Sequence, residues 1–375
     1  MSLNANLRDA KRNKNDEFYT QLPDIENELK HYKAHFRGKV VYCNCDDPTE
    51  SNFYRHFSAN FEHLGLKRLI ASCYRNDSRD LFSQHDSEQA AWIEYTGNPR
   101  GEGLPRPEDA ALRRFDEDGD FRSPESIELL QQADIVVTNP PFSLFREYVA
   151  QLMEHGKRFL IVGTQNAVTY KEIFPLIKEN RMWLGMTPKG RDMLFDVPSE
   201  YAQELRETKK EGSAYRLVDG VVKGRLGNAA WFTNLDHAGR HEELPLFRRY
   251  TPEDYPHYDN YDAINVNKIA DIPMDWDGAM GVPITFLDKY NPDQFEILGF
   301  SSLWDDGFES HTFYDDYSEF RPDGTKSGMS GQKANGYPIL RGSPRKGNYL
   351  VRGEDVVHCL YRRVFVRRRD PTISG

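Results

Sequence analysis

The segment that most constrains the fold is residues 133–156, ADIVVTNPPFSLFREYVAQLMEHG. Its first part is an apolar, largely β-branched run that ends at Asn139, which is typical of a strand buried on both faces, as in a parallel sheet. Its second part has the periodicity of an amphipathic helix and closes at Gly156. A buried strand that turns directly into a helix predicts an α/β domain.

Strand and helix patterns alternate over the rest of the first two thirds of the chain, with short connections. We expect helices over residues 24–36, 52–64, 123–133 and 170–180, and strands over residues 39–44, 68–74, 91–97, 157–163, 181–187 and 228–235. Ser123, followed by proline, is the expected cap of the third helix. This alternation predicts a doubly wound α/β sheet, which places functional sites at the carboxyl ends of its strands.

The composition of the sequence changes near residue 239, where Pro, Tyr, Asp and Gly become frequent and long helical periodicity ends. We therefore predict two domains, residues 1–238 and residues 239–375, the second mainly β or irregular. Residues 281–300 are expected to form strand, loop and strand. Residues 190–225 are interpreted as an excursion between the last two strands of the first domain, and as a loop that closes over the substrate.

Composition excludes several classes of protein. No apolar run approaches the roughly 18 residues of a membrane-spanning helix, and the N-terminus has no apolar signal-peptide core. Four cysteines in 375 residues do not indicate a disulfide framework, and the single residue between Cys43 and Cys45 does not fit the usual metal spacing. We expect a cytoplasmic protein without a metal. The lack of heptads or an obvious interface helix favours a monomer.

The net charge of -10 argues against a passive polyanion binder, but the charge is segregated. Residues 341–370 hold nine Arg or Lys against three acidic residues. A solvated basic strand is one interpretation of this segment, and contact with phosphates is the other. The candidate phosphate contacts are Arg362, Arg363, Arg367 and Arg368.

Asn139, Pro140, Pro141 and Phe142 follow the buried strand directly, where such a sheet carries its chemistry. An aromatic amine such as that of adenine is a poor nucleophile, because its lone pair is delocalised into the ring. An Asn oxygen and a backbone carbonyl fixed by two prolines can accept its N–H groups and free the lone pair. Phe142 offers a face on which an extruded base can stack. The alternative is a plain Pro-Pro turn that ends strand pairing.

Further candidate residues lie in three segments that precede or follow predicted strands. They are Phe18, Tyr19 and Thr20 in NDEFYTQ, Asp46 and Asp47 in CNCDDP, and Asp120 and Phe121 in GDFRS. A carboxylate at a strand end suits ribose hydroxyls or an ammonium group, and a carboxylate beside an aromatic ring suits an adenine ring. Each segment taken alone is as consistent with an ordinary turn.

At these residues the chain resembles the EcoRI-type adenine-specific DNA methyltransferases. The matching segments include KNDEFYTQ, VVYCNCDDPTESNFY, GDFRS, ADIVVTNPPFSLFREYV, NAAWFTNL and VPITFLDKYNPDQFEILG, and they extend over most of the chain. The resemblance implies a Rossmann-like methyltransferase domain, a C-terminal target-recognition region, S-adenosylmethionine as cofactor and duplex DNA as substrate. It also implies that Asn139 to Phe142 are catalytic and that Phe18 to Thr20, Asp46, Asp47, Asp120 and Phe121 form the cofactor pocket.

The sequence departs from the usual methyltransferase pattern at one loop, and the motif allows several alternative functions. The loop after the first strand, CNCDDPTES, has no glycine, whereas many methyltransferases have a glycine-rich loop there. The same NPPF motif serves enzymes that methylate an RNA base or a protein glutamine. Cytosine N4 is disfavoured, because a Ser usually stands in place of the Asn. A catalytically silent DNA-binding module on the same fold is the alternative from a different class.

Overall fold

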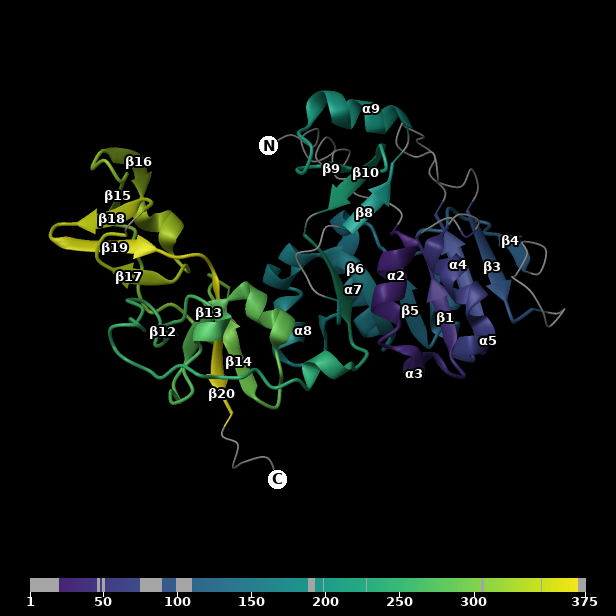
Figure 1. Ribbon diagram of the computed structural model, residues 1–375, viewed down its shortest axis with the longest axis horizontal. Coiled ribbons are helices and arrows are strands. Elements are labelled where there is room, and N and C mark those ends of the chain that lie inside the picture. The colour runs from purple at the N-terminus through teal and green to yellow at the C-terminus, as the bar shows by residue number, and fades with distance from the viewer. Residues whose placement is uncertain are drawn as a thin grey trace. The chain divides into compact units, whose positions relative to one another are not determined.

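The computed structural model divides the chain into two compact units (Figure 1). Unit 1 comprises Met1–Ile173 and Met182–His237, and unit 2 comprises Phe174–Arg181 and Ala238–Gly375. The structure describes residues 20–45, 48, 51–74, 90–98, 110–187, 193–197, 199–226, 228–304, 307–344 and 346–369. Unit 1 combines helices with a large sheet and unit 2 is mainly β, so the predicted α/β class with a mainly β C-terminal region is confirmed at this level.

An eight-stranded sheet with the order β4-β3-β2-β1-β5-β6-β11-β7 forms the centre of unit 1. Its strands are β1 (Val40–Cys43), β2 (Arg68–Cys73), β3 (Ala91–Tyr95), β4 (Ala111–Arg114), β5 (Ile135–Thr138), β6 (Arg158–Thr164), β7 (Trp183–Leu184) and β11 (Ala229–Thr233). The four central strands, β2, β1, β5 and β6, are parallel, and the outer pairings are antiparallel. The sheet is therefore mixed, whereas the sequence pattern had indicated a parallel one.

The helices of unit 1 carry the predicted apolar faces but are shorter than predicted. Those outside the excursion of residues 190–225 are α2 (Leu22–Leu29), α3 (Lys33–Phe36), α4 (Asn52–Ala59), α5 (Phe61–Leu64), α6 (Pro124–Gln132) and α7 (Phe145–Glu154). The helix predicted over residues 52–64 breaks at Asn60, whose side chain donates to the His56 carbonyl at 2.8 Å and competes with the helical backbone. Ser123 caps α6 as predicted, because its hydroxyl accepts from the Ser126 N–H at 3.2 Å.

A fully buried carboxylate, that of Glu28 in α2, holds the chain after β7. It accepts hydrogen bonds from the Tyr32 hydroxyl and from the backbone N–H groups of Met186 and Thr187, each at 2.7 Å. A Cβ on Gly185 would lie 2.4 Å from a Glu28 oxygen, so the close approach needs glycine. Buried donors without acceptors are costly, so this carboxylate fixes the start of the excursion that follows β7.

That excursion is a small folded sheet, and not the loop that the sequence had suggested. It contains β8 (Met193–Asp196), α9 (Ser199–Thr208), β9 (Tyr215–Val218) and β10 (Val221–Leu226), with the strand order β8-β10-β9. Leu205, Tyr215 and Val222 form its own apolar core. Figure 1 shows this sheet and α9 beyond one end of the strands of the large sheet.

Unit 2 has two antiparallel-rich sheets and a short helix, α8 (Phe174–Lys178). One sheet, of order β12-β13-β20-β14, contains β12 (Ile264–Asn265), β13 (Met280–Pro283), β14 (Phe295–Phe300) and β20 (Arg363–Arg368). The other, of order β16-β15-β18-β19-β17, contains β15 (Ser318–Phe320), β16 (Lys326–Ser330), β17 (Ile339–Arg341), β18 (Tyr349–Arg352) and β19 (Asp355–Cys359). The strand, loop and strand predicted over residues 281–300 correspond to β13, a 3₁₀ turn over Ile284–Lys289 and β14. None of the described helices is long and apolar enough to span a membrane.

We predict that Glu28→Ala lowers the free energy of unfolding by about 3 kcal/mol, because it removes the buried carboxylate that accepts from the Tyr32 hydroxyl and from the Met186 and Thr187 N–H groups. Glu26→Ala, an exposed substitution on the same helix, is the matched control and should have little effect. Urea denaturation of both variants measures the difference. A loss for Glu28→Ala no larger than that of the control would show that the carboxylate does not hold this segment.

Candidate active site

The carboxyl ends of β1 and β5 meet at one residue, Asn44. The two strands are parallel neighbours, with Val41 opposite Ile135 and Tyr42 opposite Val136. Beyond the paired segment, the Thr138 hydroxyl donates to the Asn44 backbone carbonyl. The Tyr148 hydroxyl, from α7, donates to the Asn44 side-chain oxygen. The end of β1 is thereby tied both to the end of β5 and to the helix that follows it.

The NPPF segment lies where the sequence places it, at the carboxyl end of β5. Asn139 is only 7% exposed, and it follows a strand whose four residues are all buried. Pro141 precedes a 3₁₀ turn over Phe142–Leu144, and its carbonyl accepts from the Leu144 N–H at 3.0 Å. Phe142 is half-buried and packs against the core of unit 1. The turn is therefore held from both sides, by the sheet and by α7.

The GDF loop, residues 119–121, contacts α7 through Phe121, next to the junction of β1 and β5. The Phe121 ring packs edge-on against the Tyr148 ring, with centroids 5.1 Å apart, and the Phe121 carbonyl accepts from Gln151 of α7 at 3.0 Å. A Cβ on Gly119 would lie 2.7 Å from the Cys73 carbonyl, and Gly119 has a φ of +72°, so this turn requires glycine. The loop is fixed between the end of β2 and α7.

Asp120 is held ionised by a neighbouring guanidinium. Its two carboxylate oxygens accept from Arg122 at 2.8 and 2.7 Å, and Arg122 also donates to Glu147 at 3.0 Å. The hydrogen bonds from the Arg122 side chain lower the pKa of Asp120 below its ordinary value. A carboxylate with about four lone-pair sites retains acceptor capacity beyond these bonds. Asp120 can therefore still accept from a bound group.

Thr20 is the described member of the NDEFYTQ segment. Its side chain is 1% exposed, and its hydroxyl oxygen has no hydrogen-bond partner among the residues that the structure describes. Its backbone carbonyl accepts from Asn52 of α4 at 2.9 Å. A buried hydroxyl of this kind is suited to a bound polar group. Phe18, Tyr19, Asp46 and Asp47 lie outside the described residues.

The loop after β1 has an unusual backbone at Cys45. This residue has a φ of +79°, in the left-handed region that glycine adopts without strain. Cys45 follows Asn44 directly, so the constrained residue is next to the junction of β1 and β5. The glycine-rich loop that the sequence lacks is thus replaced here by a strained cysteine, a feature typical of ligand-binding sites.

Sequence reasoning missed the residues that position this site. Asn44, Thr138 and Tyr148 connect β1, β5 and α7, and Arg122 connects Asp120 to α7. Tyr148 is fully buried, which raises the pKa of its hydroxyl well above the ordinary value, so it stays protonated and donates. The one sequence signal was the Asn at the end of the first strand, which is uncommon at a buried position without a partner.

The structure gives the predicted phosphate contacts of unit 2 different environments. Arg363 is 7% exposed within β20, and Arg367 donates to Glu296 at 2.8 Å. Arg368 donates to the Met274 carbonyl. Arg362 lies over the Tyr337 ring, 4.3 Å from its centroid. Arg363 is thus buried within the sheet, whereas Arg367 is exposed and Arg362 and Arg368 are half-buried.

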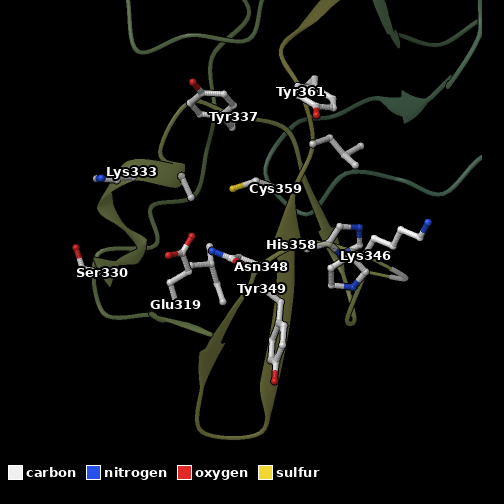
Figure 2. Close-up of a pocket in the computed structure, with 15 residues that line it drawn as sticks. Glu319, Ser330, Lys333, Tyr337, Lys346, Asn348, Tyr349, His358, Cys359 and Tyr361 are labelled. Atoms are coloured by element: carbon white, nitrogen blue, oxygen red, sulfur yellow. The ribbon is translucent and has the colours of Figure 1, made fainter. Parts of the chain in front are cut away.

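Unit 2 also has a cavity of about 650 Å³ beside its five-stranded sheet (Figure 2). Tyr337, Tyr349 and Tyr361 line it together with Lys333 and Lys346. Tyr361 is 87% exposed, which is unusual for an aromatic ring. Aromatic faces next to cations are the groups that stack on bases and contact phosphates.

Comparison with known proteins shows the family to which the chain is related. Residues 6–369 match the family model described as adenine-specific methyltransferase EcoRI. The type II methyltransferase M.EcoRI of Escherichia coli is 51% identical over 300 residues, which cover 79% of this chain and 89% of that protein. The type II methyltransferase M.MpnI of Mycoplasma pneumoniae (strain ATCC 29342 / M129 / Subtype 1) is 40% identical over 295 residues, which cover 77% of this chain and 83% of that protein. No solved structure matches the chain.

These matches define the class of protein as a methyltransferase, which requires a methyl donor. The chain belongs to the EcoRI family of adenine-specific methyltransferases. It is an adenine-specific DNA methyltransferase of the kind found in type II restriction–modification systems. Family membership decides between this activity and the alternatives that the motif alone left open.

We predict that the strained backbone at Cys45 makes Cys45→Gly more stable than Cys45→Ala by about 1 kcal/mol, because only glycine adopts this φ without strain. Cys45→Val should be the least stable of the three. Thermal and urea unfolding of the variants give the ranking. An alanine variant at least as stable as the glycine variant would contradict the left-handed conformation.

Proposed function

We propose that this chain transfers the methyl group of S-adenosylmethionine to the N6 amine of an adenine that is flipped out of a specific duplex DNA sequence. The observation that carries the proposal is the junction of β1 and β5, where Asn139 and the Pro-Pro turn follow a fully buried strand. Unit 1 is interpreted as a Rossmann-like sheet, because the chain passes from β1 outward to β2 and returns to β5 on the other side of β1. Ligands bind at such a switch point.

The amine is activated by acceptors that are already in place. We assign the Asn139 side-chain oxygen as one acceptor for the two amine hydrogens. The Pro141 carbonyl is engaged by the Leu144 N–H, so we assign the Pro140 carbonyl as the other. Two accepted hydrogen bonds draw the nitrogen toward tetrahedral geometry and stabilise the charge that develops on it. The fixed φ of the prolines means that no reorganisation is needed.

Phe142 and the enclosing residues hold the base. The half-buried Phe142 ring offers one face to the adenine while its other side packs on the core. Base-flipping enzymes stack the extruded base between aromatic or apolar side chains, which offsets part of the unstacking energy. Alignment of the amine with the methyl donor supplies much of the remaining rate.

The described residues fit the cofactor. The buried Thr20 hydroxyl, the ionised Asp120 and the Phe121 ring are the groups that would hold it, together with Phe18, Tyr19, Asp46 and Asp47 of the sequence prediction. S-adenosylmethionine, when bound, supplies a methyl group already activated on a sulfonium. The chain itself then has to bind, orient and exclude water, and a metal is not needed for that chemistry.

Unit 2 is proposed to recognise the target sequence. The domain assignment is a methyltransferase domain over residues 1–238 and a target-recognition region over residues 239–375. Arg362, Arg367 and Arg368 contact phosphates in this proposal, and the cavity lined by Tyr337, Tyr349 and Lys346 is a further candidate surface. We propose that the enzyme works as a monomer in the cytoplasm, where the DNA of a bacterial cell is accessible.

Asn139→Ala is expected to lower the methylation rate by about 10² to 10³, because one of the two acceptors for the amine is removed. Binding of S-adenosylmethionine, measured by calorimetry, should change little. Single-turnover methylation of plasmid DNA, followed by sequencing that detects N6-methyladenine, gives both the rate and the target site. Full activity of the variant would rule out this mechanism.

Arg367→Ala combined with Arg368→Ala should reduce the dependence of DNA binding on salt. The slope of log K against log salt should become shallower by about 0.9 for each phosphate that the protein no longer neutralises. Arg363 is excluded from the test because it is buried. Lys67→Ala, an exposed substitution just before β2 at the amino edge of the sheet, is the matched control. A slope that is unchanged relative to the control would remove these arginines from the interface.

A further inference from the structure

The turn between β9 and β10 presents apolar side chains to solvent. Leu217 is 43% exposed, Val218 38% and Val221 55%, so three neighbouring aliphatic side chains are exposed on one short hairpin. The turn itself is Asp219-Gly220, with φ of +50° and +78°. Positive φ at both central residues is the signature of a tight type I′ hairpin. The hairpin is therefore narrow and its apolar tip is well defined.

The register of β9 and β10 shows which side chains share each face of this hairpin. Val218 lies opposite Val221, and Arg216 lies opposite Lys223. Because side chains alternate along a strand, these four residues share one face, with the valines at the tip and the two cations behind them. Tyr215 and Val222 occupy the other face, where they form the core with Leu205 of α9. The outward face is thus apolar next to the turn and basic two residues farther along each strand.

The hairpin is braced along its length. Arg206 of α9 donates to the Gly220 carbonyl at 3.0 Å, inside the turn. The Glu211 carboxylate accepts from the Leu217 N–H at 3.2 Å, and Arg225 donates to the Gly212 carbonyl at 2.6 Å. An exposed tip that is held this firmly is preorganised for contact with something else.

The hairpin belongs to the same edge of the large sheet as the active site. Both β6 and β7 are antiparallel to β11, so β7 is parallel to β6 and to β5. The excursion therefore leaves from the edge at which β5 ends in Asn139, and it returns to that edge where β11 begins. At its base, Asn228 donates to the Thr164 hydroxyl, at the end of β6, at 2.9 Å. Figure 1 shows β8, β9 and β10 together beyond the end of β6.

We propose that the tip of this hairpin enters the substrate duplex and occupies the space that the flipped adenine leaves. Val218 and Val221 form the wedge, and Arg216 and Lys223 on the same face contact the flanking phosphates. Proteins that open DNA insert apolar side chains between base steps and hold the distorted backbone with cations. Leu217 extends the apolar surface on the opposite face of the tip. The inference rests on the function proposed above and adds a role for residues outside the NPPF site.

The test compares two duplexes that contain the mapped target site. In one the target adenine is paired with thymine, and in the other it faces an abasic position, where extrusion costs less. Val218→Ser with Val221→Ser removes the wedge, while Val218→Ile with Val221→Ile keeps it apolar. Leu112→Ser is the matched control, because Leu112 is 59% exposed on β4, at the far edge of the same sheet. Thermal unfolding of each variant confirms that it is folded.

Single-turnover methylation at saturating cofactor and DNA is the readout. The serine variant should be slowed about tenfold or more on the paired duplex and should come within about twofold of the wild type on the abasic duplex. The isoleucine variant and Leu112→Ser should match the wild type on both. A serine variant that is as fast as the wild type on the paired duplex, or equally slowed on both, would overturn the wedge. Failure of the wild type on both duplexes would instead overturn the proposed function.

Discussion

The hydrogen bonds that converge on Asn44 are the constraint on which the site depends. The Thr138 hydroxyl bonds to its backbone carbonyl and the Tyr148 hydroxyl to its side chain, and both donors belong to elements that flank the Asn-Pro-Pro-Phe turn. One buried amide thereby fixes the end of β1, the end of β5 and the start of α7 relative to one another. Asn44 is 5% exposed, so neither bond has to compete with solvent. The polar junction therefore gives the turn a defined position.

The same edge of the sheet gathers elements that are distant in sequence. The Asp120–Phe121 loop reaches it through Tyr148 and Gln151, and the segment at Thr20 is held by a hydrogen bond from Asn52. At the same edge, Glu28 fixes the chain directly after β7, where the excursion that contains the hairpin begins. In our account this edge brings together the methyl donor, the extruded adenine and the duplex. Chemistry of this kind depends mainly on alignment, which such a rigid frame provides.

Much of this arrangement could be predicted from the sequence, and the failures have physical reasons. Residues 133–156 combine a β-branched run, a Pro-Pro turn and helical spacing, so local pattern and tertiary fold agree there. The strands of unit 2 are mostly three to six residues long and irregularly spaced, and such segments carry little periodicity. The basic run groups Arg363 with its neighbours by charge, but the burial of its side chain depends on the register of β20, which composition does not show. The positive φ of Cys45 and the partners of Asn44 arise only when distant segments meet.

The most direct test of the central claim is transfer of tritium from S-adenosylmethionine labelled in its methyl group to duplex DNA, with an RNA control. After digestion, the product nucleosides are resolved by chromatography. We predict that the label is found in N6-methyladenine from DNA and that RNA remains unlabelled. Label in another nucleoside or in RNA would contradict the assigned acceptor. Unlabelled DNA, from a protein that is shown to bind the cofactor, would contradict the assignment of the Asn139 site to adenine in DNA.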